Sequence, residues 1–193
     1  MKGKLIIFSA PSGAGKTTIV KHLLGQPFDM QFSVSATSRK PRPGETEGQD
    51  YYFLSEKQFR EKIENGEFLE WEEVYPGIYY GTLKSEVERI RNLGNNVIFD
   101  VDVKGGLNIK QYYQNEALAL FVKPPSVEEL KKRLLSRSTE SEDKINMRIA
   151  KAEYELGFRH QFDNVIVNDK LENAFAETEK IVKDFLKKRS RES

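Results

Sequence analysis

A loop of small residues running from Ser9 to Thr18, with the sequence SAPSGAGKTT, offers the clearest chemistry in the chain. Gly13 and Gly15 allow positive φ angles, so the backbone can turn its N–H groups inward and surround an anion. Lys16 can reach the β- and γ-phosphates of a nucleotide, and the Thr17 hydroxyl can ligate Mg²⁺. We therefore expect a nucleoside triphosphate to contact Ala10, Pro11, Ser12, Gly13, Ala14, Gly15, Lys16, Thr17 and Thr18.

The segments on both sides of this loop fit the same interpretation. The apolar run 5–8 before it predicts a buried strand, and apolar residues after Thr18 recur at helical spacing. Ala10 stands where the usual phosphate-binding pattern has its first glycine, and its methyl group is small enough to fit. The alternative is an ordinary glycine turn before a core helix.

A second candidate anion site lies in the charged loop 37–45. Arg39 and Arg42 are close in sequence, and Pro41 and Pro43 keep the backbone between them extended. Each guanidinium can bind two phosphate oxygens at once, so the loop is a candidate phosphate clamp. A solvated basic loop is the alternative.

Carboxylates at the end of the apolar run 97–99 could hold a metal ion. We expect a strand over 97–102 with Asp100 and Asp102 on the same face, and Asp100 as a ligand of Mg²⁺ at the carboxyl edge of a parallel sheet. This pattern is also compatible with a strand that merely ends at an aspartate.

Two helices that carry arginines are predicted between residues 125 and 160. Capping sequences at 126–129 and 139–142 would open them, and Arg137 and Arg148 would lie on the resulting helical hairpin. The hairpin is a candidate lid over the phosphates, and a pair of solvated, salt-bridged helices is the alternative.

The remaining pattern alternates strands with helices, which predicts an α/β fold with a mainly parallel sheet. We expect a half-exposed strand over 32–36, a short strand over 51–54, a helix opened by Ser55, and a hairpin turning at 76–77. Thr82 is expected to cap a helix over 83–93. Further core strands are predicted at 117–122 and 162–167, and Asn168 with Asp169 would cap the last helix.

Composition limits the classes of function that remain. The 193 residues carry a net charge of +1 and no cysteine, so nothing predicts a broad nucleic-acid-binding surface, a disulfide or a thiolate site. No apolar run approaches the roughly 20 residues of a membrane helix, and the first strand follows the initiator Met too closely for a signal peptide. We expect a cytoplasmic protein without nucleic-acid or membrane partners; monomer and homodimer both remain open.

Several motifs together resemble the guanylate kinases over nearly the whole length. They are the loop 9–17, the run 35–45 (SATSRKPRPGE), the segment 48–51 (GQDY), and the shorter matches at 70–71, 80–82, 100–102 and 165–169. The resemblance implies a P-loop NTPase-type core (1–32, 83–124 and 161–193), an inserted β-rich GMP-binding subdomain (33–82) and a helical lid (125–160). It also implies Mg²⁺-dependent transfer of the γ-phosphoryl group from ATP to GMP.

The resemblance also implies roles for individual residues. Lys16, Arg39, Arg42, Arg137 and Arg148 would be catalytic, and Arg137 and Asn168 would join the loop in binding ATP. The implied GMP contacts are Ser35, Arg39, Arg42, Glu45, Tyr51, Glu70, Tyr80, Thr82 and Asp102. Thr82 replaces the serine found in other members but keeps the hydroxyl.

Two other functions remain compatible with the sequence. One is a kinase for another small phosphorylated acceptor, and the other is a non-catalytic module that binds phosphopeptides in the GMP groove. Glu70 argues against the first, because a carboxylate can accept from the adjacent N1–H and 2-amino groups of guanine, which adenine lacks. Intact Gly13, Gly15, Lys16 and Thr17 argue against the second.

Overall fold

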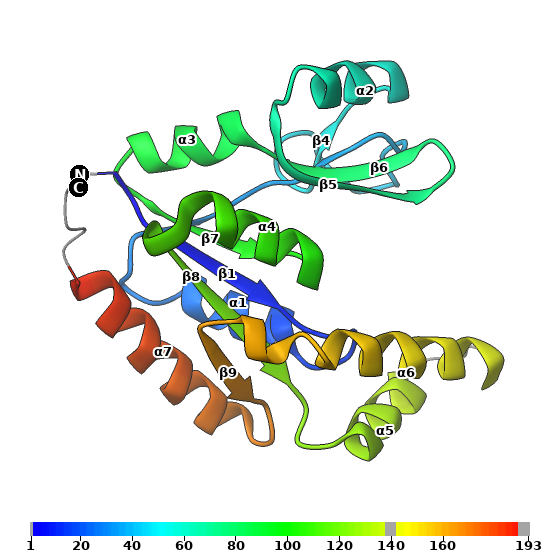
Figure 1. Cartoon of the computed structure of the whole chain (residues 1–193), viewed down its shortest axis with the longest axis vertical. Coiled ribbons are helices and arrows are strands. Elements are labelled where there is room, and N and C mark those ends of the chain that lie inside the picture. Colours follow the sequence, from blue (N-terminus) through cyan, green and yellow to red (C-terminus); the bar gives the residue numbers. More distant parts are fainter. Residues whose placement is uncertain (1, 138–141, 189–193) are drawn as a thin grey trace. The chain divides into compact units, whose positions relative to one another are not determined.

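The computed structural model describes residues 2–137 and 142–188, which form two compact units. The first unit consists of residues 1–4 and 31–97, and the second of residues 5–30 and 98–193. Figure 1 labels the helices and strands of both units. Strands and helices alternate along the chain, so the predicted α/β class is confirmed.

Parallel strands form the centre of the second unit. Strand β1 (Leu5–Ser9) pairs in parallel with β8 (Ala117–Lys123), which pairs in parallel with β9 (Asn164–Val167). These strands belong to a five-stranded sheet of order β2-β7-β1-β8-β9, in which β2 spans Met30–Phe32 and β7 spans Asn96–Asp100. All five residues of β1 are buried, which explains why this strand is a continuous apolar run rather than an alternating one.

Helices cover both faces of these strands. In Figure 1, α4 (Val103–Tyr113) and α1 (Lys16–Leu24) lie on opposite sides of β1 and β8. Helix α7 (Leu171–Lys187) packs beside α1, and a short 3-10 turn, Gln114–Glu116, joins α4 to β8. Helices α5 (Val127–Arg137) and α6 (Glu142–Leu156) form the predicted helical pair, and the 3-10 turn Arg159–Gln161 precedes β9.

The first unit contains a four-stranded sheet of order β4-β3-β6-β5. Its strands are β3 (Ala36–Thr37), β4 (Tyr52–Phe53), β5 (Phe68–Tyr75) and β6 (Ile78–Leu83). Helix α2 (Glu56–Glu64) covers one face, and α3 (Lys84–Asn92) follows β6 directly. The β5–β6 hairpin turns at 76–77 and the Ser55–Gln58 capping box is formed, so both predictions are confirmed.

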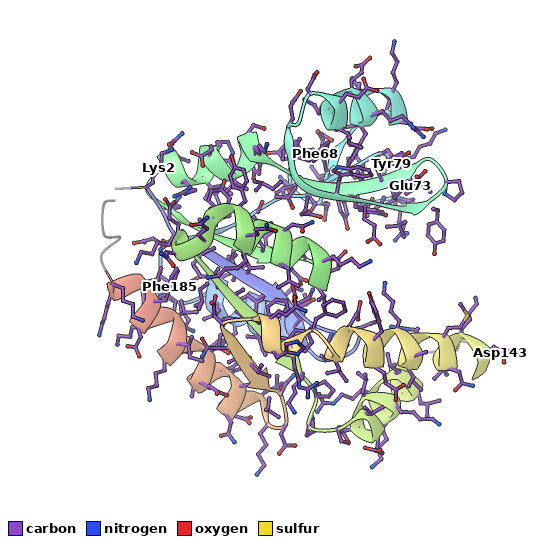
Figure 2. The ribbon with its side chains drawn as sticks, in the orientation of Figure 1. Lys2, Phe68, Glu73, Tyr79, Asp143 and Phe185 are labelled. Atoms are coloured by element: carbon purple, nitrogen blue, oxygen red, sulfur yellow. The ribbon has the colours of Figure 1, made fainter. Side chains whose placement is uncertain are left out.

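Aromatic rings form a separate small core in the first unit. Phe59 of α2 is fully buried and stacks on Phe68 and Tyr79, with ring centroids 4.4 and 5.4 Å away. Phe68 and Tyr79 are labelled on the hairpin in Figure 2. Ala36 and Leu83 complete the buried cluster, so this unit has an apolar core of its own.

Four local predictions are wrong. The segment 32–36 is not one strand, because β2 (Met30–Phe32) ends before Ser33 and β3 begins at Ala36. Strand β7 ends at Asp100, and Asp102 instead caps α4. Thr82 lies inside β6 while Leu83 occupies the N-cap position of α3.

The fourth wrong prediction concerns the last helix. Its N-cap position is occupied by Lys170, which makes no side-chain cap, so neither Asn168 nor Asp169 caps it. At 126–129 the serine half of the predicted capping box is formed, since the Glu129 N–H donates to the Ser126 hydroxyl. Of the capping sequence predicted at 139–142, residues 139–141 lie outside the described residues.

We expect Phe59→Ala to lower the free energy of unfolding of the first unit by about 3–5 kcal/mol, because it removes the ring at the centre of the aromatic core. Urea unfolding followed by circular dichroism measures the loss. Leu93→Ala is the control, since Leu93 is exposed. Equal stability of the two variants would contradict an independent core around Phe59.

Candidate nucleotide-binding sites

The loop between β1 and α1 has the backbone that an anion site requires. Gly13 and Gly15 have φ angles of 89° and 91°, which L side chains rarely adopt. Gly15 is also the N-cap residue of α1, so the positive end of the helix faces the loop. A pocket of about 410 Å³ opens here. It is lined by residues 10–18, Asp100, Val101, Asp102, Arg148, Lys151 and Glu155.

Lys16 and Thr17 both contact Asp100 at the end of β7. The Lys16 ammonium lies 2.6 Å from one carboxylate oxygen of Asp100 and also donates to the Val101 carbonyl at 2.7 Å. The Thr17 hydroxyl donates to the other carboxylate oxygen at 3.0 Å. A carboxylate and a hydroxyl side by side are hard oxygen donors, and they fit Mg²⁺ better than a softer metal.

No protein cage for a metal accompanies this pair: within residues 2–137 and 142–188, no group of three or more His, Cys, Asp or Glu side chains could hold an ion. This agrees with the usual coordination of Mg²⁺ in nucleotide enzymes, in which one or two protein oxygens join the substrate phosphates and water. The donor set therefore fits the predicted ion.

Asn168, predicted as an ATP contact, forms a hydrogen bond to the backbone of the phosphate loop. It follows β9, is only 4% exposed, and its side-chain amide donates to the Ala14 carbonyl at 2.8 Å. A Cβ at Gly15 would collide with the same amide nitrogen. The close approach of Asn168 therefore gives a second reason, besides the positive φ, for glycine at position 15.

Helices α5 and α6 reach the loop through both apolar and polar contacts. Leu130 and Leu134 lie so close to Gly13 that a Cβ there would meet their methyl groups at 3.2 and 3.0 Å. Arg148 donates to the Ser12 hydroxyl at 2.7 Å, so this predicted lid arginine does lie beside the loop. Arg137 ends α5, and its side chain lies outside the described residues.

Two charged pocket residues were missed by the sequence reasoning. Lys151 and Glu155 lie three and seven residues after Arg148 on α6, which puts all three on one face of the helix. That spacing was the available signal, but charged residues at helical spacing are common on solvated faces. Asp102, predicted as a GMP contact, also lines this pocket, and its carboxylate accepts from the Gly105 N–H at 2.7 Å.

In the first unit, Glu45 holds Arg39 in a fixed orientation. Its two carboxylate oxygens accept from both terminal nitrogens of Arg39 at 2.6 Å, and one also accepts from the Arg42 N–H at 2.8 Å. The Arg39 Nε donates to the Tyr80 hydroxyl at 3.0 Å. The guanidinium also lies 4.9 Å from the ring centroid of Tyr51. The structure therefore brings together five of the predicted GMP contacts.

This network shifts the ionisation of both partners. The hydrogen bonds from Arg39 lower the pKa of Glu45 to about 2, with the Arg42 N–H contributing in the same direction. The pKa of Arg39 is raised above its ordinary value, chiefly by Glu45. Arg39 thus stays a cation whose orientation is set before any substrate arrives, and the exposed Arg42 side chain adds a second positive charge.

Glu70 and Thr82 form the other polar pair of the first unit. They face each other across the β5–β6 ladder, and the Thr82 hydroxyl donates to one carboxylate oxygen of Glu70 at 2.5 Å. Ser35, in the irregular segment between β2 and β3, is half-buried, and its carbonyl accepts from the Tyr52 N–H at 2.9 Å. A carboxylate oriented by a neighbouring hydroxyl can accept two parallel donors from a flat ring.

Comparison with known proteins identifies the family. The sequence model of the family Guanylate kinase matches residues 2–185. The chain belongs to the guanylate kinase family. It is 58% identical to the guanylate kinase of Bacteroides thetaiotaomicron, with 97% of this chain and 92% of that protein covered. The guanylate kinase of Bacteroides fragilis is 55% identical over 96% of this chain and 91% of that protein.

A solved structure supports the same assignment. The crystal structure of guanylate kinase from Anaplasma phagocytophilum matches with a TM-score of 0.73 and 27% identity, covering 97% of this chain and 88% of that one. These comparisons confirm the predicted family, while the roles of individual residues remain predictions.

Within the described residues, no helix is long and apolar enough to span a membrane.

The lowered pKa of Glu45 predicts how the Glu45–Arg39 pair responds to acid. Because the folded-state pKa of about 2 lies below the ordinary 4.5, the pair stabilises the fold fully above pH 4.5. This stabilisation is lost as the pH falls toward 2. Urea unfolding of wild type and Glu45→Gln should therefore show a difference at pH 6 that shrinks between pH 4.5 and 2. A difference that stays constant over that range would contradict the ion pair.

Proposed function

We propose that this chain catalyses the transfer of the γ-phosphoryl group of ATP to the phosphate of GMP, giving ADP and GDP. The membership of the guanylate kinase family supports this activity, and one feature of the molecule carries the proposal. A phosphate loop with an intact lysine and a second, arginine-based anion site occur in the same chain. An enzyme that joins two phosphorylated substrates needs both.

The donor nucleotide would bind at the loop of the second unit. Inward-facing N–H groups around Gly13 and Gly15 would surround its β-phosphate, and Lys16 would leave Asp100 to contact the β- and γ-phosphates. Arg148 would exchange its bond to Ser12 for one to the transferring group. We propose that Arg137 adds a further positive charge from the end of α5, within a lid over 125–160.

Magnesium fits this site through the Thr17 hydroxyl and the Asp100 carboxylate. When bound with ATP, the ion would neutralise charge on the β- and γ-phosphates and hold them in one conformation. The protein residues would fix the position of the nucleotide. The loop would enclose the phosphates, and Asn168 holds the loop through its hydrogen bond to the Ala14 carbonyl. We propose Asp100 as the carboxylate that holds the ion.

The acceptor would bind in the first unit, within residues 33–82. Arg39, already oriented by Glu45 and Tyr80, would bind the GMP phosphate together with Arg42 and the hydroxyl of Tyr51. Glu45 would then act as a positioning residue for Arg39, because both of its oxygens are already used. Asp102 is proposed as a further contact of GMP.

Selection of guanine would depend on Glu70. Its carboxylate would accept from the N1–H and the 2-amino group of guanine, while the Thr82 hydroxyl and Ser35 would contact the rest of the ring. Adenine has no donors at these positions, so its ring would offer the Glu70 carboxylate no hydrogen bonds, at a cost of about 1–3 kcal/mol.

No general base is needed for this chemistry. The nucleophile is a phosphate oxygen of GMP that is already ionised at neutral pH, so no proton has to be removed from it. Catalysis would consist of aligning that oxygen with the γ-phosphorus and neutralising the charge that spreads over the transferring group. Cations at Lys16, Arg39, Arg42, Arg137 and Arg148 suit that task. A cytoplasmic location would supply both nucleotides.

An assay of ADP release with GMP, AMP, UMP and dTMP as acceptors tests the proposal. We expect turnover with GMP to exceed that with each of the others by at least about tenfold. Faster turnover with another monophosphate would mean that this monophosphate, and not GMP, is the acceptor. Binding of GMP without any turnover in the presence of ATP and Mg²⁺ would favour a binding module over an enzyme.

Lys16→Ala should reduce kcat by roughly a hundredfold or more while leaving the Kd for GMP within about twofold, because Lys16 would neutralise charge on ATP but not contact GMP. Steady-state kinetics and calorimetric titration with GMP measure the two effects. Lys21→Ala, an exposed lysine on the same helix, is the matched control. Unchanged turnover in the Lys16 variant would refute the role of the loop.

Glu70→Gln should raise the KM for GMP about tenfold or more and narrow the preference for GMP over AMP, since an amide accepts less strongly and adds a donor where guanine already has two. The same acceptor panel measures the change. Glu73→Gln is the control: Glu73 accepts from the Gly77 N–H at the hairpin turn, a bond that glutamine can keep. Undiminished selectivity in the Glu70 variant would mean that guanine is recognised elsewhere.

A further inference from the structure

One carboxylate that belongs to neither proposed substrate site is almost completely buried. Glu86, in the first turn of α3, is only 3% exposed. Charged side chains are seldom buried this deeply in proteins. Figure 1 shows α3 leading directly away from the end of β6. Because isolated buried charge is costly, the groups that surround Glu86 explain why it is tolerated there.

Three hydrogen bonds reach this carboxylate from two parts of the first unit. Arg89 of the same helix donates from Nε and Nη2 at 2.8 and 3.0 Å, and the Tyr52 hydroxyl of β4 donates at 2.9 Å. Burial alone would raise the pKa of Glu86, but the bonds from Arg89 and Tyr52 outweigh it and the pKa is lowered. The group therefore remains an ionised acceptor.

One of these donors, Tyr52, adjoins residues of the proposed GMP site. It immediately follows Tyr51 in the sequence, and its backbone N–H donates to the Ser35 carbonyl at 2.9 Å. Through Tyr52, Glu86 therefore restrains both the segment that presents Ser35 and the segment that presents Tyr51.

The segment that carries Ser35 lies outside the strands of the sheet. Residues 33–35 lie between β2 and β3 and belong to neither strand. Strand β3 has only two residues, Ala36 and Thr37, which pair in parallel with β4 and antiparallel with β6. The bond from the Tyr52 N–H to the Ser35 carbonyl therefore adds a restraint next to β3, and Glu86 holds the Tyr52 side chain.

We propose that Glu86 is a positioning residue for GMP, which sets the places of Ser35 and Tyr51 through Tyr52. This inference rests on the proposed function and adds a residue that does not touch the substrate. If Glu86 served stability alone, its removal would lower the melting temperature without a selective effect on GMP. The two roles therefore differ in what they predict for substrate binding.

The test compares Glu86→Gln and Tyr52→Phe in the full chain with Glu88→Gln as a matched control. Glu88 is on the same helix and pairs with Lys2 and Arg91. We expect the Kd for GMP to rise about tenfold in Glu86→Gln and about threefold in Tyr52→Phe, with the KM for ATP within about twofold in both. In Glu88→Gln the Kd for GMP should stay at the wild-type value.

A double-mutant cycle separates positioning from a general loss of stability. In a Ser35→Ala/Tyr51→Phe background, Glu86→Gln should weaken GMP binding by less than about twofold, because the contacts it acts through are already gone. Thermal unfolding of each variant accompanies the calorimetry. Wild-type GMP affinity in a folded Glu86→Gln variant, or a full tenfold effect in the altered background, would overturn the inference.

The test also covers a Glu86→Gln variant that does not fold and a wild-type protein that does not bind GMP. If Glu86→Gln fails to fold, Tyr52→Phe decides the question, since it removes a single hydroxyl and leaves the carboxylate and Arg89 paired. Wild-type affinity in Tyr52→Phe would then overturn the inference. Failure of the wild-type protein to bind GMP would refute the proposed function itself. Normal turnover of the wild-type protein, together with wild-type GMP affinity in the variants, would refute only the role of Glu86.

Discussion

The turn at Gly13 and Gly15 is the constraint around which the second unit is arranged. A backbone that directs several N–H groups to one point leaves them unpaired within the protein, so the surrounding structure has to hold the loop open. Supports for the loop converge from distant parts of the chain: Asn168 after β9, the leucines of α5 at Gly13, and Arg148 of α6 at Ser12. At Gly15 and Gly13 the approach is so close that an added Cβ would meet the Asn168 amide or the leucine methyl groups.

The proposed anion site of the first unit is built by a different means. Its positive charge comes from long side chains, which would lose much conformational freedom on binding a phosphate. Glu45 and Tyr80 would reduce this loss because they already hold Arg39, and Glu86 would do the same for Tyr52, whose N–H bonds to the Ser35 carbonyl. The candidate binding groups of both units are thus held in place by the protein itself, in one unit by backbone conformation and in the other by side-chain hydrogen bonds and ion pairs.

The sequence predicted the features that depend on local rules. Glycines at Gly13 and Gly15, the Ser55 capping box and the hairpin turn at 76–77 could be placed because each is decided by a few neighbouring residues. The buried strands were predictable from their apolar runs. The family followed from the spacing of several motifs, and the sequence model of that family confirms it.

Errors arose where a distant partner decides the outcome. Thr82 was expected to cap a helix because of its neighbours, but Glu70 across the hairpin occupies its hydroxyl. Asn168 was expected to cap α7, but the Ala14 carbonyl, far away in sequence, takes its amide. Glu86 gave no signal at all, since a glutamate in the first turn of a helix is common on exposed surfaces and only the fold buries it.

The contact between α5 and Gly13 links two events that are usually considered apart. Because Leu130 and Leu134 rest directly on the loop and Arg148 bonds to Ser12, the helical pair and the loop share a single set of contacts. A nucleotide bound in the loop would meet the same contacts, and could therefore favour one position of the helices over another. By thermodynamic reciprocity, if a nucleotide favours one position of the helical pair, a substitution that favours that position raises nucleotide affinity, even at a residue that never meets the ligand.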